Sequence, residues 1–144
     1  EERDTVIVTE FDPSTVTRYR LKEDWIFDKQ RSVLECRIIG ILPLMVEFEP
    51  DGITEKGTRP LFWIYFNELR PYLIRYEYFN RLNDGQRITY DDAFAKRMFH
   101  SYIIKESNVY DRYINAYATG IDALLESERI KNDIFIFEHD LWEF

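Results

Sequence analysis

The chain has 144 residues, enough for one domain that buries about two-thirds of its unfolded surface. Its 27 acidic residues outnumber its 19 lysines and arginines, and the net charge of −8 argues against nucleic acid as the main partner, because that binding begins with neutralising phosphates. With 45% hydrophobic and 32% charged residues, the composition is globular rather than disordered, and no apolar run is long enough to span a membrane.

The start of the chain is weakly patterned, so we expect an N-terminal arm over residues 1–18 and a core domain over residues 19–144. Because the sequence opens without a methionine and stops just after an apolar run, we expect it to be a piece of a longer protein. Apolar and polar residues alternate over residues 19–28, with two exceptions at positions 23 and 26. Such alternation predicts a half-buried strand.

A second strand is predicted over residues 33–41, where the same alternation returns. Gly40 and Pro43 then predict a bulge or bend before a further apolar stretch at residues 44–48, because proline is tolerated in a sheet only at an edge or a kink.

The sequence Pro50-Asp51-Gly52, with Gly57 after it, predicts a loop between strands. Residues 61–66 follow as six consecutive apolar residues, so alternation is lost. A strand covered on both faces has this pattern, and so does a strand whose second face meets another protein. We expect one face of this segment in the core and the other near a partner.

A short helix is predicted over residues 67–79, with Asn67 as its N-cap, Pro71 in its first turn and an end near residues 83–85. A longer helix is predicted from Thr89, its N-cap, to residue 103, with two aspartates near its positive end.

A third helix is predicted over residues 111–126, and Gly120 borders its apolar stripe, where it would let another element approach closely. Residues 134–137 predict a strand that returns to the sheet. The fold class expected is therefore α+β: an antiparallel sheet with about three helices packed on it and a C-terminal strand returning to the sheet. The stripe of the third helix comprises Tyr113, Ile114, Tyr117, Ile121, Leu124 and Leu125.

Motifs for catalysis or cofactor binding are absent from the sequence, and we predict no catalytic residue, no metal site, no cofactor and no enzymatic activity. His100 is expected to be solvated. His139 lies between Glu138 and Asp140, but neighbouring side chains of a strand point to opposite faces, so these three side chains are not expected to converge on a metal or a proton-transfer site. Cys36 is expected to act as a small buried hydrophobe, while an intermolecular disulfide stays open in an oxidising compartment.

Aromatic residues make up 17% of the chain, more than the interior of so small a domain readily holds. If some rings form an exposed patch, that patch is a binding surface, because contiguous apolar area is rare on monomers. A well-filled aromatic core with scattered exposed tyrosines is equally compatible with the composition. The interface candidates are Trp63, Tyr65, Phe135 and Phe137.

Several segments resemble the family of the gliding motility protein GldN, called PorN in non-gliding relatives. The similarity extends over about residues 19–144. The segments are YRLKEDWIFDK at 19–29, RIIGI at 37–41, PLFWIYF at 60–66, FAKRMF at 94–99 and KESNVYDR at 105–112.

This resemblance implies a component of the type IX secretion system of Bacteroidota, located in the periplasm at the inner face of the outer membrane. It also implies three partners: a lipoprotein similar to GldK or PorK, a motor subunit similar to GldM or PorM, and further copies of the chain in a ring. The family supplies no catalytic residues to carry over.

We therefore expect a non-enzymatic scaffold subunit. The alternative from another class is a periplasmic domain that binds or cleaves glycans with exposed aromatics beside two carboxylates about 5–10 Å apart. A third possibility is a plain monomeric domain with an ordinary core. A deep aromatic cleft would favour the glycan domain, and flat apolar patches would favour the scaffold.

Overall fold

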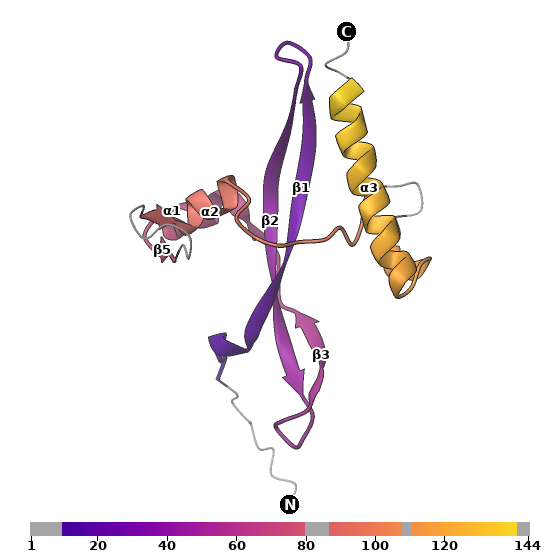
Figure 1. The fold of residues 1–144 in the computed structure, drawn as a ribbon. Coiled ribbons are helices and arrows are strands. Elements are labelled where there is room, and N and C mark those ends of the chain that lie inside the picture. The colour runs from indigo at the N-terminus through magenta and orange to yellow at the C-terminus, as the bar shows by residue number, and fades with distance from the viewer. Residues whose placement is uncertain (1–9, 80–86, 108–110, 141–144) are drawn as a thin grey trace, which may run out of the picture. The chain divides into compact units, whose positions relative to one another are not determined.

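The computed structural model describes residues 10–79, 87–107 and 111–140, the last four of these by their backbone alone (Figure 1). Within this part of the chain, antiparallel strands are combined with three α-helices, which confirms the α+β class. The chain divides into two compact units, which we describe separately. The first comprises Glu1–Asp24 and Arg37–Pro71, and the second comprises Trp25–Cys36 and Tyr72–Phe144.

The long hairpin drawn in Figure 1 consists of β1 (Val16–Asp28) and β2 (Val33–Phe48). It confirms both strands predicted from alternation, although β1 begins three residues earlier than predicted, after a 3₁₀ turn, η1 (Pro13–Thr15). The hairpin turn is held by the carboxylate of Asp28, which accepts hydrogen bonds from the backbone N–H and the guanidinium of Arg31.

Strand β2 is the central strand of the first sheet, and it pairs with β1, β3 (Glu55–Pro60) and β4 (Ile64–Tyr65). Strand β2 runs through both Gly40 and Pro43 without interruption, so the bulge or bend predicted there does not divide the strand. Its pairing with β3 is irregular only at the far end, between Glu47 and Phe48. Since its carbonyl accepts from the N–H of Leu61 at 3.0 Å, Pro43 still contributes one hydrogen bond.

The loop predicted at residues 50–52 is confirmed. Gly52 has φ +70°, and the carboxylate of Asp51 accepts from the backbone N–H groups of Ile53 and Thr54, each at 2.9 Å. Gly57 is not a loop residue, since it lies in β3 opposite Glu47.

The apolar run at residues 61–66 forms a strand only at Ile64 and Tyr65, so the six-residue strand is wrong in extent. Phe66 already begins helix α1 (Phe66–Leu73). This helix contains Asn67 and Pro71 in its interior, contrary to the predicted cap and first-turn positions, and it ends six residues before the predicted limit. The predicted end at residues 83–85 lies outside the described residues.

The second unit contains a two-stranded sheet of β5 (Glu77–Tyr78) and β6 (Ile88–Thr89), followed by α2 (Tyr90–Ala95). Thr89 is the N-cap, as predicted: its hydroxyl accepts from the N–H of Asp92, whose carboxylate accepts from the N–H of Thr89.

Helix α2 ends eight residues before its predicted limit. Arg97 adopts φ +52°, and the N–H groups of Arg97 and Met98 donate to the carbonyls of Phe94 and Ala93. This is a Schellman ending with arginine at the position that usually holds glycine. The apolar pattern at residues 94–103 gave no sign of it, because glycine was missing.

Helix α3 (Ile121–Asp140) replaces two predicted elements. The predicted helix over residues 111–126 starts ten residues late, preceded by the 3₁₀ turn η2 (Ile114–Ala116), and the predicted C-terminal strand at 134–137 is helical. A short apolar run does not separate helix from strand, and here it continues a helix already formed. Gly120 adopts φ +57° before α3, and a β-carbon there would meet no described atom within 4 Å, so its role is conformational rather than one of close approach.

The buried core is small and mostly aliphatic. In the first unit it consists mainly of alternate residues of β2, together with Phe66, and in the second unit it is divided among β6, α2, η2 and α3. In the part of the chain that the structure describes, the buried apolar residues are Ile41, Leu42, Leu44, Val46, Phe66, Ile88, Ala93, Ile114 and Ile130.

Candidate functional site

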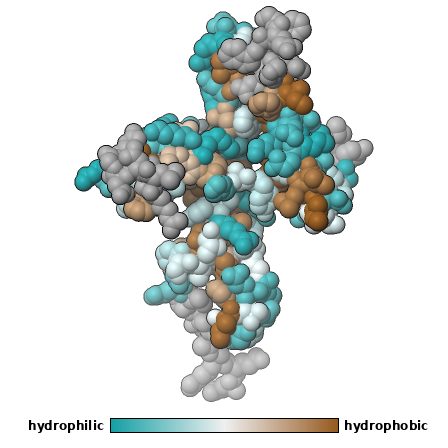
Figure 2. All heavy atoms as spheres, viewed as in Figure 1, coloured by the Kyte–Doolittle hydropathy of each residue, from teal (hydrophilic) through white to brown (hydrophobic). Residues whose placement is uncertain are grey.

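The surplus of aromatic residues lies at the surface. Phe66 is the one aromatic residue in the buried core of the described residues, whereas Trp63, Phe62 and thirteen other rings are exposed. Figure 2 shows hydrophobic side chains, in brown, at the surface over α3 and over the sheet. The equally compatible alternative of a well-filled aromatic core is therefore excluded, and interaction surfaces are the features to examine.

The first surface, which we call the aromatic edge, consists of Phe62, Trp63 and Tyr65 in the first unit. Their exposed fractions are 64%, 53% and 51%. The indole of Trp63 lies against Gly40 of β2, and a β-carbon at Gly40 would stand 3.2 Å from its Cε3 atom. Tyr65 pairs with Gly40 through the backbone, and its hydroxyl accepts from Asn67 Nδ2 at 3.1 Å.

Trp63 and Tyr65 are thus each held by a contact, with Gly40 and with Asn67, while about half of each residue stays exposed. Rings fixed in this way lose little conformational entropy when a partner covers them, so they suit protein recognition. The two candidates predicted here, Trp63 and Tyr65, lie on one short segment, as expected, although that segment is not a continuous strand.

The second surface, which we call the outer face of α3, carries Phe135, the third candidate, at 65% exposure. The opposite side of the helix is buried through Ser127 and Ile130, and the hydroxyl of Ser127 accepts from the N–H of Ile103 at 3.0 Å. Phe137, the fourth candidate, belongs to α3, but its side chain lies outside the described residues. The exposed apolar residues of this face are Ile121, Leu124, Leu125, Phe135 and Ile136.

Sequence reasoning assigned Ile121, Leu124 and Leu125 to the buried stripe of a helix over residues 111–126. That assignment is wrong, because the helix starts only at Ile121. Residues 113–117 are not part of it, so they do not share a helical stripe with Ile121, Leu124 and Leu125, which are exposed. The signal that could have found the outer face is the repeat of apolar residues eleven or twelve positions apart, from 124–125 to 135–136.

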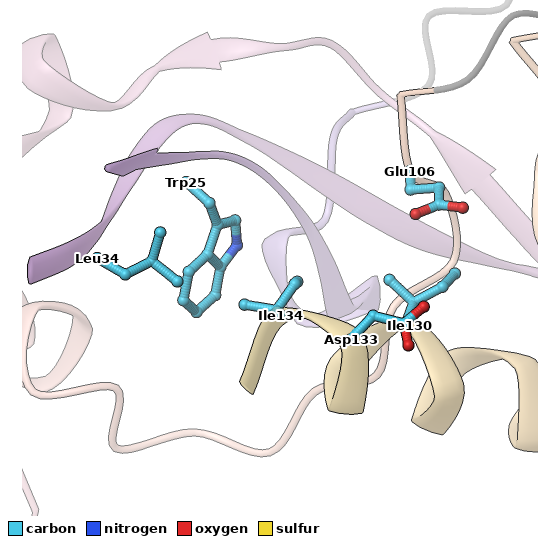
Figure 3. Close-up of a pocket in the computed structure, with 6 residues that line it drawn as sticks. All are labelled: Trp25, Leu34, Glu106, Ile130, Asp133 and Ile134. Atoms are coloured by element: carbon cyan, nitrogen blue, oxygen red, sulfur yellow. The ribbon is translucent and has the colours of Figure 1, made fainter. Parts of the chain in front are cut away.

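A groove of about 290 Å³ lies in the second unit (Figure 3). The indole of Trp25, from β1, stands in the picture between Leu34 of β2 and Ile134 of α3. Glu106 and Asp133 line the groove near Ile130. The groove therefore combines one aromatic ring with two carboxylates, the feature that the glycan alternative needs.

The charges around the groove do not resemble an acid–base pair. Arg129 lies 4.0 Å from Glu106 and forms ion pairs with Asp133 and, at 2.7 Å, with Glu126. Its hydrogen bond lowers the pKa of Glu126, and these carboxylates in turn raise the pKa of Arg129. Both carboxylates that line the groove therefore share one arginine as a partner, an arrangement typical of a structural ion-pair network.

Cys36 is half-buried on β2, and Arg97 Nη1 donates to its Sγ atom at 3.2 Å. The same guanidinium stands 5.7 Å from the Trp25 ring centroid and 5.1 Å from that of Phe99. The expected role of Cys36 as a small buried hydrophobe is therefore incomplete, because the thiol is only half-buried and has a cationic neighbour. An intermolecular disulfide at Cys36 stays a prediction.

His100 is exposed, as predicted, and the side chain of His139 lies outside the described residues. Within the described ranges, no three residues among histidine, cysteine, aspartate and glutamate lie close enough together to hold a metal ion. Nor does any helix there have the length and apolar character needed to cross a membrane.

The comparison with protein-family models decides the family. The model described as "Gliding motility associated protein GldN" matches residues 1–143. The chain belongs to the GldN family. No curated protein sequence matches it significantly.

Membership of the GldN family confirms the resemblance seen in the sequence and extends it to residues 1–18. It makes this chain a gliding motility-associated protein. For a GldN family member, the aromatic edge and the outer face of α3 are more informative than the groove, because a component of a motility machinery must contact other proteins.

Proposed function

We propose that this GldN family member is a non-enzymatic scaffold subunit of the type IX secretion and gliding machinery. In this proposal it assembles into a periplasmic ring at the inner face of the outer membrane. Its partners are a GldK- or PorK-like lipoprotein, a GldM- or PorM-like motor subunit and further copies of itself. Support comes from the family match over residues 1–143 and from the resemblance of its motifs to that family.

The observation that carries the proposal is the aromatic edge. Trp63 is supported by Gly40 and held at 53% exposure, while the buried core around it is mainly aliphatic. A pre-placed tryptophan is the kind of residue that dominates binding energy at protein interfaces. A ring also needs two different patches on each subunit, and the chain offers the aromatic edge on one unit and the outer face of α3 on the other.

The test is photocrosslinking in cells from a benzoyl-phenylalanine placed at Trp63, with Phe135 as a second position. Lys56 on β3 is the matched control, because it is exposed but carries no aromatic ring. We expect position 63 or 135 to capture the lipoprotein, the motor subunit or another copy of the chain, and position 56 to capture none of them. Equal capture at all three positions, or none at 63 and 135 in gliding cells, would contradict the proposal.

The groove allows the glycan alternative to be tested directly, since Trp25 lines it and tryptophan fluorescence responds to bound sugars. On the scaffold proposal, soluble peptidoglycan fragments at millimolar concentration leave the fluorescence unchanged. Saturable quenching that is lost in Trp25→Ala would favour the glycan-binding domain instead.

A further inference from the structure

The outer face of α3 contains two parallel lines of side chains with the same spacing. One line consists of Leu124, Glu128, Lys131 and Phe135, and the other of Leu125, Arg129, Asn132 and Ile136. Within each line the steps are four, three and four residues, so at 3.6 residues per turn each line runs nearly parallel to the helix axis. Together the two lines cover about 160° of the circumference.

Each line shows the same pattern of polarity whether it is read from its N-terminal or its C-terminal end. Apolar residues occupy the two ends, polar residues occupy the middle, and the four–three–four spacing is unchanged when it is reversed. When a second α3 runs antiparallel to the first and the two helices are centred at the level of Ile130, apolar residues therefore face apolar residues and polar residues face polar residues.

In this register Leu124 of one copy faces Phe135 of the other, and Leu125 faces Ile136. Between these apolar pairs, Glu128 of one copy faces Lys131 of the other, and the two-fold axis produces each pair twice. Both charged side chains are exposed, and neither forms an ion pair with any residue that the structure describes. The charges are thus complementary in the antiparallel arrangement, as in antiparallel helix pairs generally.

We propose that two copies of this chain associate through antiparallel pairing of their α3 helices. Four of the five large apolar residues on the face are paired, and those four are 53–65% exposed in a single copy. Eight such side chains from two copies supply on the order of 1,000 Å² of buried area, near the lower limit for a specific interface. We therefore expect a weak dimer, with a dissociation constant on the order of 10 µM.

The contact does not rest on the proposed function, because it follows from α3 alone. It is an isologous contact, in which the same surface of both copies meets, so it occupies the outer face of α3 in place of the head-to-tail contact that a ring would make there. Its test uses the purified chain without lipoprotein or motor subunit, so its failure and the failure of the crosslinking experiment are separate results.

The test exchanges charges across the proposed seam. In Glu128→Lys two lysines face each other at each contact, and in Lys131→Glu two glutamates do so. Each single variant is expected to weaken dimerisation about tenfold or more in sedimentation equilibrium, because two attractive pairs become repulsive. An equimolar mixture of the two variants restores both pairs, so the mixture is expected to dimerise as well as the original chain.

The double variant Glu128→Lys/Lys131→Glu provides the matched control, since it keeps the composition and restores the pairing within one sequence. Circular dichroism of each variant checks that α3 remains helical. The proposal is overturned if the original chain is monomeric at several hundred micromolar, if the single variants dimerise unchanged, or if the mixture does not recover. A partner other than a second copy would give the first of these results.

Discussion

Gly40 and Trp63 are in direct contact: a β-carbon on the glycine would stand 3.2 Å from Cε3 of the indole. The absent side chain lets the ring lie on β2, while the adjoining residue Ile64 is joined to the same strand by backbone pairing. The tryptophan is therefore positioned by a glycine in the middle of a strand, where glycine would otherwise weaken the sheet.

The first prediction concerns this contact. Gly40→Ala forces the indole outward by a few tenths of an ångström, and we expect it to lower the free energy of unfolding by about 1 kcal/mol. It should also change the emission maximum of Trp63 relative to a Trp63→Phe reference. Gly57→Ala is the matched control, because a β-carbon there meets nothing within 4 Å, and it should stabilise the chain by about 0.5 kcal/mol. Equal effects of the two substitutions in urea denaturation would contradict the prediction.

The second prediction separates folding from assembly at Trp63. Because the ring is 53% exposed, Trp63→Ala should cost about 2 kcal/mol in the free energy of unfolding, less than a fully buried tryptophan. Its effect on assembly should be larger, as expected for a central interface residue. Pull-down from gliding cells measures assembly, and Lys56→Ala is the control. Normal recovery of partners with Trp63→Ala would show that the aromatic edge is not an interface.

The third prediction concerns acid stability. A hydrogen bond from the backbone N–H of Thr89 lowers the pKa of Asp92, and one from the guanidinium of Arg31 lowers the pKa of Asp28. A carboxyl whose pKa is lower in the folded state stabilises that state above its unfolded pKa, about 4. The resulting stability should be lost as the pH falls from about 4 through the lowered values.

Urea denaturation between neutral and acidic pH measures this loss. Asp92→Asn keeps an acceptor for the Thr89 N–H but cannot titrate, so its unfolding midpoint should fall less steeply on acidification than that of the original chain. Thr89→Ala removes the cap itself and should cost about 1 kcal/mol at neutral pH. If Asp92→Asn follows the same pH curve as the original chain, the Thr89–Asp92 cap does not contribute to the acid response.

The fourth prediction tests the start of α3. Gly120 adopts φ +57°, and space around it is open, so Gly120→Ala should be destabilised by backbone strain alone, by about 1 kcal/mol. Asparagine tolerates this conformation better, so Gly120→Asn should cost less. The free energy of unfolding from urea titrations ranks the two variants, and a larger cost for asparagine would point to steric crowding instead of strain.

Local patterns predicted the elements whose signals are themselves local. The strands β1 and β2 followed from alternation, the loop at Asp51 and Gly52 from its turn residues, and the start of α2 from the capping residue Thr89. Helix ends were predicted poorly, because Arg97 takes a left-handed conformation that arginine seldom adopts. The final apolar run, read as a strand, is equally compatible with the end of a long helix.

By itself, the sequence determined the α+β class, the long hairpin, the family and the excess of aromatic residues over what a small core can bury. Only the tertiary structure decided which apolar residues lie inside. Leu44 and Leu125 are chemically identical, yet one is buried in β2 and the other is exposed on α3. The physical reason is that burial depends on which elements pack together. Hydrophobicity along a sequence measures the tendency of a residue to leave water, but it does not say whether its own chain or another covers it.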